Sequence, residues 1–529
     1  MRLIKKQFIF CICIGVLTYS LPYYMYWSDE TLRFTEEVEP TLRKKYRTFV
    51  EVTDKLPARN LNLVPDLRAG TVNFYEALER ISDSSYTVVL TVIDSGYIDT
   101  FMNFVQTIVL NAGVTNILPI CNDRESFDLL LSLHMPCYFW WEVKGAGKAT
   151  VFGDSFEFKQ KVNTKIEVTL EAIRYGFNVL LSDIDIYYNK NPFDHFPCST
   201  CDLLIQNNSM TQRKNTGFIY VRPTEASIDI YQTAWDNIVE SNWTLMDQPA
   251  INRLLTKYDR AAEKGQVLEP HLNYQILDPK KFPCGKEYFM YRPFSRIEDS
   301  PGVVIVHNNQ IKTKEDKTYR FKEHFMWLVD TDGYYSDPYR KYITFDIPVY
   351  TASYEGLDND FSALKNALML GEILNRTVIL PKFFCQGVRC IMGICPTQED
   401  RCPMNAHIFL ELFDAHFANK YRESTFLENK QTAAAVKESI SPLLYIENNK
   451  DKTEADYDET ITPQNIDKGA SETEIKSLLS NYRDYSVIQF HSLYYGFTGF
   501  DNPNVQANFD KKVSNEEAFT RKIHKPRCC

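Results

Sequence analysis

The sequence lacks several features that would point to other classes of protein. It has only 20 glycines among 529 residues, and 44% of its residues are hydrophobic, which argues against a collagen-like or fully disordered chain. Lys and Arg total 59 against 69 Asp and Glu, so no positive excess favours wrapping DNA or another polyanion. After residue 27 no apolar run approaches the length of a membrane span, and no internal repeat is present. A globular chain of about two to four folding units remains, at roughly 100–200 residues per domain.

The N-terminus is the exception, because residues 8–27 contain no charged residue. Twenty helical residues span ~30 Å, which is the thickness of the hydrocarbon core of a bilayer. Arg2, Lys5 and Lys6 precede this run, and acidic residues dominate after it. The positive-inside rule therefore predicts a cytosolic tail at 1–7, a signal anchor and a lumenal body. A cleaved signal peptide is the alternative.

The cysteines fit a lumenal body. Eleven of the 13 cysteines follow the apolar segment, where an oxidising compartment would allow disulfides. Cys198 and Cys201 form a lone CxxC, and because zinc would need a second pair, a disulfide is favoured. An odd number of lumenal cysteines leaves one thiol free or bonded to another chain, which makes a disulfide-linked homodimer possible. Four cysteines lie close together in one loop and predict that disulfides cross-link it: Cys385, Cys390, Cys395 and Cys402. Three Asn-X-Ser/Thr sequences are glycosylation acceptors if lumenal: Asn207, Asn242 and Asn375.

Two α/β units are predicted after a stem. Residues 28–84 are charged and interrupted by proline, as in a stem. Over 85–335, strands alternate with helices, the pattern of an open α/β sheet. A second α/β unit is predicted over 345–529, with a charged, mobile loop near 448–474. The expected strands are 87–93, 116–120, 179–181, 202–205, 217–221, 303–306, 377–380 and 485–490, and the expected helices include 101–110, 162–177, 227–239 and 364–374.

Two acidic residues, Asp183 and Asp185, directly follow the expected strand 179–181. In open α/β sheets, ligands bind at the carboxyl edge of the strands. Carboxylate oxygens suit Mg²⁺ or Mn²⁺, and such a cation can neutralise a departing diphosphate. A bare Asp-X-Asp pair is also common in solvated loops, so the surrounding sequence decides whether this pair indicates a metal site.

The context is a series of short motifs in a fixed order along the chain. The motifs are 92–97, 176–185, 215–218 with 222–223, 247–248, 307–309, 317–321, 364–381, 402–403 and 421–423. Together they resemble the nucleotide-diphospho-sugar transferases of the GT-A fold, most closely glycosyltransferase family 77, over residues 86–510. The resemblance implies a Rossmann-like open mixed sheet and a type II membrane protein of the Golgi. It also implies a Mn²⁺-dependent, retaining transfer of a sugar from a nucleotide diphosphate, such as a UDP-sugar, to a hydroxyl of a glycan or glycoprotein.

The resemblance also implies roles for single residues. Asp247 and Gln248 would orient donor and acceptor while the diphosphate assists attack on the same face; Asp247 as a covalent nucleophile is the alternative. The alternative roles are a helix cap for Asp94 and Asp247, and solvent-exposed surface lysines in place of donor-binding ones. The expected metal ligands are Asp183, Asp185 and His307. The expected donor-binding residues are Asp94, Tyr97, Lys165, Asp183, Asn215, Gly217, Lys312 and Lys317.

Two other classes fit the same residues less well. A phosphohydrolase with an Asp-X-Asp nucleophile would need Thr or Val two residues on and a later acidic pair with a Lys, but Ile186 and Tyr187 follow here. A non-catalytic lectin-like or scaffold protein could keep the fold, but would not need the metal and donor motifs together. We therefore expect an enzyme.

Overall fold

The computed structural model describes residues 41–143, 155–208, 213–290, 294–348, 354–385, 400–444, 470–494 and 497–514. The predicted cytosolic tail and signal anchor lie outside these ranges, as does most of the loop predicted near 448–474. Within the described ranges, every helix is too short or too polar to span a bilayer.

Seven strands form the main sheet, in the order β3–β2–β1–β4–β7–β6–β8. The first four run parallel, whereas β7 is antiparallel to both of its neighbours and β8 runs parallel to β6. The sheet confirms the mixed α/β class expected for this region. The strands are β1 (Thr87–Ile93), β2 (Ile117–Cys121), β3 (Tyr138–Phe139), β4 (Asn178–Ser182), β6 (Leu203–Asn207), β7 (Lys214–Val221) and β8 (Tyr274–Ile276).

Helices pack against this sheet and bring polar side chains to its carboxyl edge. The helix α8 (Phe156–Arg174) packs on β1 and β4, and its stripe of Ile166, Leu170 and Ile173 is buried. Gly176 follows it with φ 91, a left-handed conformation that ends the helix and turns the chain into β4. The other helices of this unit are α6 (Ile98–Leu110), α7 (Arg124–Ser132), α9 (Glu225–Glu240), α10 (Asp247–Glu263) and α11 (Lys314–Glu323).

The described part of the predicted stem is folded. It forms α2 (Arg47–Thr53), α3 (Ala58–Leu61), α4 (Leu63–Ala69) and α5 (Phe74–Ile81). Their apolar side chains, Phe49, Leu63 and Leu78 among them, are buried in the same core as the main sheet. Burying one such side chain stabilises the folded state by roughly 1.5–3 kcal/mol. This segment therefore packs with the first unit instead of extending from it.

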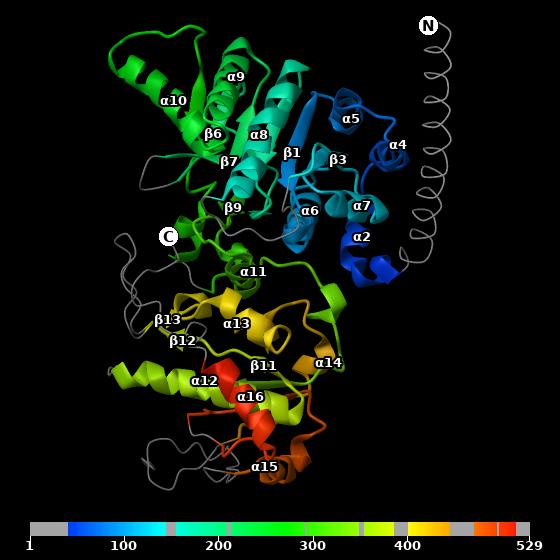
Figure 1. The fold of residues 1–529 in the computed structure, drawn as a ribbon, viewed down its shortest axis with the longest axis vertical. Coiled ribbons are helices and arrows are strands. Elements are labelled where there is room, and N and C mark those ends of the chain that lie inside the picture. The colour runs from blue at the N-terminus through cyan, green and yellow to red at the C-terminus, as the bar shows by residue number, and fades with distance from the viewer. Residues whose placement is uncertain are drawn as a thin grey trace, which may run out of the picture.

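A second α/β unit follows, drawn from yellow-green to red in Figure 1. Its sheet is parallel, in the order β14–β11–β10–β15, and it has its own apolar core. Its strands are β10 (Tyr342–Phe345), β11 (Thr377–Ile379), β14 (Tyr421–Arg422) and β15 (Val487–Phe490), with a small antiparallel pair, β12 (Phe383–Phe384) and β13 (Arg401–Cys402). Its helices are α12 (Tyr354–Leu374), α13 (Leu410–Phe417), α14 (Ala434–Lys437), α15 (Glu472–Leu478) and α16 (Pro503–Val513).

Helix α11 lies between the two units and joins them (Figure 1). Glu323, at its end, accepts hydrogen bonds at Oε1 from Ser424 Oγ (2.8 Å) and Tyr319 OH (3.2 Å). The adjacent Glu423 accepts from the hydroxyls of Tyr334 and Tyr335 at 2.6 and 2.8 Å. The start of α11 faces the first unit, so one helix contacts both units.

The cysteines follow the predicted disulfides in part. Cys198 is bonded to Cys201, and Cys385 to Cys402, which staples β13 to the end of β12. Within the described ranges, three cysteines rather than one form no disulfide, and all are buried: Cys121, Cys137 and Cys284. Because none of these thiols is accessible, they give no support to a disulfide-linked dimer.

Candidate active site

The chain turns at the two aspartates. β4 ends just before Asp183, and after Asp185 the chain continues as β5 (Ile186–Tyr188), which pairs with β9 (Ile305–His307). The backbone N–H of Asp183 donates to the carbonyl of Gly217 at 2.7 Å, which ties the turn to β7. Asp183 and Asp185 therefore lie in the short connection between β4 and β5.

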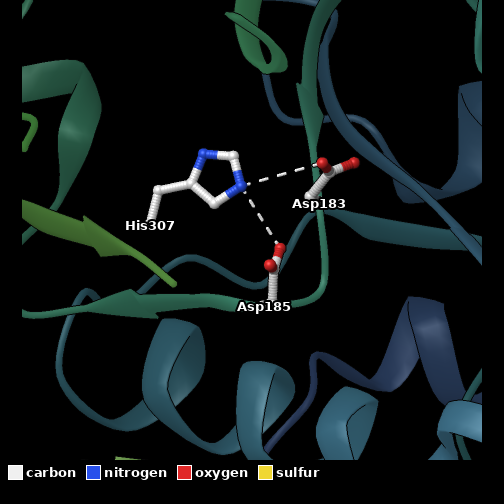
Figure 2. Close-up of side chains that lie close together, drawn as sticks. All are labelled: Asp183, Asp185 and His307. Atoms are coloured by element: carbon white, nitrogen blue, oxygen red, sulfur yellow. Dashed lines mark ion pairs between the residues drawn. The ribbon is translucent and has the colours of Figure 1, made fainter. Parts of the chain in front are cut away.

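Asp183, Asp185 and His307 lie together at the carboxyl edge of β4 (Figure 2). His307 Nε2 is 3.3 Å from Asp185 Oδ1 and 3.7 Å from Asp183 Oδ2. One ligand atom from each residue lies within 4.8 Å of the others. Asp185 and His307 are buried, whereas Asp183 is partly exposed, so a ligand can approach from the Asp183 side.

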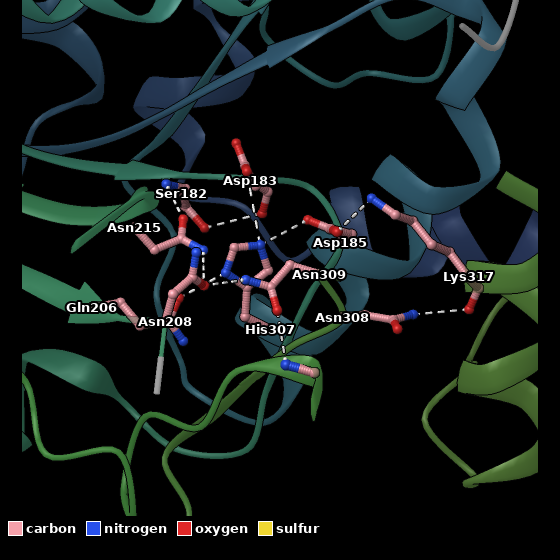
Figure 3. Close-up of polar contacts among 12 residues, drawn as sticks. Ser182, Asp183, Asp185, Gln206, Asn208, Asn215, His307, Asn308, Asn309 and Lys317 are labelled. Carbon is pink, nitrogen blue, oxygen red and sulfur yellow. Dashed lines mark hydrogen bonds and ion pairs between the residues drawn. The ribbon is translucent and has the colours of Figure 1, made fainter. Parts of the chain in front are cut away.

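A hydrogen-bond chain sets the orientation of the imidazole (Figure 3). The Gln206 amide nitrogen donates to the carbonyls of Phe282 and Pro283 at 3.0 and 3.1 Å, so its Oε1 faces His307. That oxygen is 2.7 Å from His307 Nδ1 and requires a proton on Nδ1. In the neutral imidazole, Nε2 therefore directs its lone pair at the two carboxylates. Three electron-rich atoms around one point, with a partner that fixes the tautomer, fit a divalent cation.

Two lysines neutralise the carboxylates. Lys165 Nζ, from α8, is 2.6 Å from Asp183 Oδ1, and Lys317 Nζ, from α11, is 2.8 Å from Asp185 Oδ2. Burial by itself would lower the pKa of Lys165, but Asp183 and Asp247 hold that pKa above its usual value. Burial likewise opposes ionisation of Asp185, yet Lys317, together with His307 when its imidazole is protonated, holds the pKa of this carboxyl well below its usual range. Both groups are therefore charged at neutral pH.

Strand β7 leaves room for the cluster at Gly217. A Cβ there would overlap Asp183 Oδ2 and would stand 2.7 Å from His307 Cε1. Two residues earlier, Asn215 accepts the Gly217 N–H at 2.7 Å and donates to Asn208 Oδ1 at 2.8 Å (Figure 3). Asn309 donates to the same Asn208 oxygen at 3.0 Å. This amide network ties the beginning of β7 to the segment after β9.

Asp247 joins the same site and Gln248 does not. Asp247 is buried and is the first residue of α10, whose cap is Met246. Its Oδ2 accepts from Thr216 Oγ1 at 2.8 Å and lies 3.6 Å from Lys165 Nζ. Gln248 is half-buried, and no hydrogen bond links its side chain to the cluster within the described part of the chain.

The donor-binding residues predicted beyond β1 are only partly brought together. Asp94 caps the short turn after β1, accepting the Gly96 N–H at 2.9 Å, and its other oxygen is 2.8 Å from Lys161 Nζ. Burial raises the pKa of Asp94 against the opposing effect of Lys161. Burial also raises the pKa of Tyr97, and the charges of Asp94 and Asp185 add to this shift. Lys312 is exposed, and no described contact joins it to the cluster.

The sequence interpretation missed two residues, and each carried a signal. Gln206 is the first polar residue after the apolar run Leu203–Ile205 in β6, at the edge where ligands bind. Lys161 precedes Lys165 by one helical turn, so the two share a face of α8. Only the tertiary structure shows that Lys161 meets Asp94 and that Gln206 meets His307, because these pairs join elements that are neighbours in space and not in sequence.

Comparisons with known proteins agree with this geometry. Residues 112–321 match the family model described as nucleotide-diphospho-sugar transferase. Arabinosyltransferase XEG113 of Arabidopsis thaliana is 22% identical over 491 residues, covering 82% of this chain and 73% of the relative. UDP-galactose:fucoside alpha-3-galactosyltransferase of Dictyostelium discoideum is 28% identical, covering 35% of this chain and 30% of the relative. UDP-D-xylose:L-fucose alpha-1,3-D-xylosyltransferase 1 of Arabidopsis thaliana is 26% identical, covering 30% and 48%. The chain thus spans less than half the length of two of these three relatives. The ordered motifs and these matches together identify an enzyme of the glycosyltransferase class, in which residues 112–321 are similar to the nucleotide-diphospho-sugar transferases.

Proposed function

We propose that this glycosyltransferase has a GT-A catalytic unit that takes a UDP-sugar and, with Mn²⁺, transfers the sugar with retention to a hydroxyl of a glycan or glycoprotein. The observation that carries the proposal is the cluster of Asp183, Asp185 and His307 at the carboxyl edge of β4. The names of two relatives supply the UDP-linked donor class, with galactose in one and xylose in the other.

The residues present fit a divalent cation. Two carboxylates and one imidazole nitrogen suit Mn²⁺, and the space kept open by Gly217 lies beside two of the three ligands. A cation held there would supply positive charge to the leaving diphosphate. Lys317 is in contact with Asp185, so its ammonium lies close enough to pair with the same diphosphate from the side of α11.

Asp247 and Lys165 would hold the donor sugar for same-face attack. Asp247 is fixed by Thr216 and lies beside Lys165, so its carboxylate is held in one orientation. In the transfer we propose, the bond between the sugar's C1 and the diphosphate oxygen breaks. The acceptor oxygen bonds to C1 on the same face, and its proton passes to the departing diphosphate. Gln248 would orient the acceptor from the first turn of α10.

The compartment follows from the cysteines and the N-terminal segment. Two disulfides within the described ranges favour an oxidising environment. With residues 8–27 predicted as a signal anchor, we place the catalytic units on the lumenal side of the Golgi membrane.

The test measures UDP release by the purified full chain from UDP-galactose, UDP-xylose and UDP-arabinose, with Mn²⁺ or with EDTA. We expect slow donor hydrolysis with one donor, lost with EDTA and in Asp185→Asn. Asp236→Asn, an exposed aspartate on α9, is the matched control and should keep full activity. Metal-independent release that persists in Asp185→Asn would refute the proposal. Once an acceptor is found, the anomeric configuration of the product by NMR tests retention separately.

A further inference from the structure

A cavity of about 870 Å³ lies between the two units, and none of the residues assigned to the metal or donor site lines it. Its walls come from the segment before α2, the start of α6, helix α11, residues 327–341, and the loops before β11 and β14. On α11, Thr318 and Lys322 face it, whereas Lys317 faces Asp185. Successive helical residues point about 100° apart, so the cavity and the metal cluster use different faces of one helix.

The cavity is basic although the chain as a whole carries a net charge of −10. Two lining residues are acidic, Asp99 and Asp332, which leaves an excess of four positive charges (six minus two). Asp337, which does not line the cavity, lies 3.6 Å from Arg340 and offsets part of this excess. The six basic lining residues are Lys45, Lys322, Arg340, Lys341, Arg376 and Lys420.

Several of these cations are held by groups that do not cancel their charge. Arg376 donates to five backbone carbonyls at 2.9–3.4 Å, and Lys341 donates to the carbonyl of Arg483. Carbonyl dipoles orient a cation but leave its net charge in place. Within the described ranges, Lys420 is exposed and forms no ion pair with a carboxylate.

Lys322 lies on the cavity wall, and the partners of its ammonium in the described part of the chain are aromatic rings. Its Nζ is 3.7 Å from the centre of the Tyr334 ring and 5.7 Å from that of Trp327. No carboxylate within the described ranges lies within 4.0 Å of it. Burial lowers the pKa of Lys322 to about 8, more than Glu423 and other distant carboxylates restore. An anion in the cavity would complete this site electrostatically.

Aromatic and neutral polar side chains complete the lining. Tyr46, Trp327, Tyr334 and Tyr339 contribute rings, and Tyr339 is 89% exposed, so its ring is available for stacking. Threonines and asparagines supply hydrogen-bonding groups: Thr318, Thr331, Asn375, Thr377 and Asn419. Pockets for organic ligands typically measure about 300–1,000 Å³, which is far more space than a single inorganic anion fills.

We infer that this interdomain cavity binds an anionic saccharide, a glycan that carries carboxylate, sulfate or phosphate groups. The lysines pair with the anionic groups, the rings stack on the apolar faces of the sugars, and the amides and hydroxyls bond to sugar hydroxyls. Because both units line the cavity, the ligand contacts both. The site is distinct from the donor site and does not depend on the proposed transfer.

The test is calorimetric titration of the full chain, kept in detergent because residues 8–27 are uncharged, with trigalacturonic acid. The fully methyl-esterified trisaccharide is the matched neutral probe, and inorganic phosphate is the matched small anion. We expect the acid to bind and both other probes to bind at least about tenfold more weakly, the effect of losing one charged contact. Lys420→Ala and Tyr339→Ala, both at exposed positions, should each weaken binding of the acid by roughly three- to tenfold, whereas Lys264→Ala at the far end of α10 should not.

Donor hydrolysis should be unchanged in Lys420→Ala. A failure of the cavity inference is therefore distinguishable from a failure of the proposed sugar transfer. Equal binding of the methyl ester would overturn the anionic part of the inference. Equal binding of phosphate would overturn the saccharide part. Wild-type affinity in both Lys420→Ala and Tyr339→Ala, with thermal unfolding unchanged, would place any binding outside this cavity.

Discussion

The substitution Gly217→Ala adds one methyl group where the structure leaves space for the metal cluster. The new Cβ would overlap Asp183 Oδ2 and stand 2.7 Å from His307 Cε1, against ordinary contacts of 3.4–4 Å. Gly217 lies in β7 without a positive φ, so alanine suits the backbone, and the added strain falls on the side chains of the cluster. Asp183 is partly exposed and can move, whereas His307 is held by Gln206.

The expected result is a large loss of metal affinity with a modest loss of stability. Overpacking of a buried site costs about 1–3 kcal/mol. Mutation of a residue that only hydrogen-bonds a metal ligand lowers metal affinity by ~10–100-fold. Displacement of the ligand itself should lower the affinity by at least this factor. Donor hydrolysis at subsaturating Mn²⁺ should fall by a similar factor and recover in part at high Mn²⁺.

The assay is Mn²⁺ titration of the purified chain, followed by thermal shift and by UDP release. Gly302→Ala is the matched control, because no heavy atom lies within 4 Å of the position of its Cβ and its φ is not positive; it should behave as wild type. If Gly217→Ala is folded and binds Mn²⁺ with wild-type affinity, the ion is not held between Asp183 and His307 and the reasoning fails.

Two further outcomes follow from the same structure. Gln206→Ala removes the acceptor of His307 Nδ1 and should weaken Mn²⁺ binding by about 10–100-fold, measured by the same titration; an unchanged affinity would show that the tautomer is set elsewhere. Burial raises the pKa of Glu323 to about 8 from 4.5, so the folded chain keeps a proton that the unfolded chain releases in this range. The resulting stabilisation is complete below about pH 4.5 and is lost as pH rises to about 8, with a slope of at most ~1.4 kcal/mol per pH unit. Glu323→Gln cannot ionise and should flatten this slope in urea unfolding between pH 5 and 8; a slope equal to that of wild type would contradict the assignment.

Local pattern was enough for most of the framework. The run 87–93 is β-branched and apolar throughout and is strand β1 with the same bounds, because a strand buried on both faces needs no alternation. The helical stripe near 162–177 falls within α8 except for its last residue. Boundaries were less predictable: α12 begins ten residues before its expected start at 364. The helices of 47–81 were not foreseen as core elements, because short amphipathic segments show little of what they will pack against.

The sequence by itself determined which residues have metal chemistry and which segments form strands, since both depend on residue type and local spacing. Only the tertiary structure decided that the chain turns between Asp183 and Asp185, that β9 brings His307 to them, and that Gln206 sets its tautomer. The cavity between the units was also decided only by the tertiary structure, because its walls come from segments more than 300 residues apart. Contacts between strands or units at such separations depend on how the whole chain packs, and local periodicity in the sequence does not predict them.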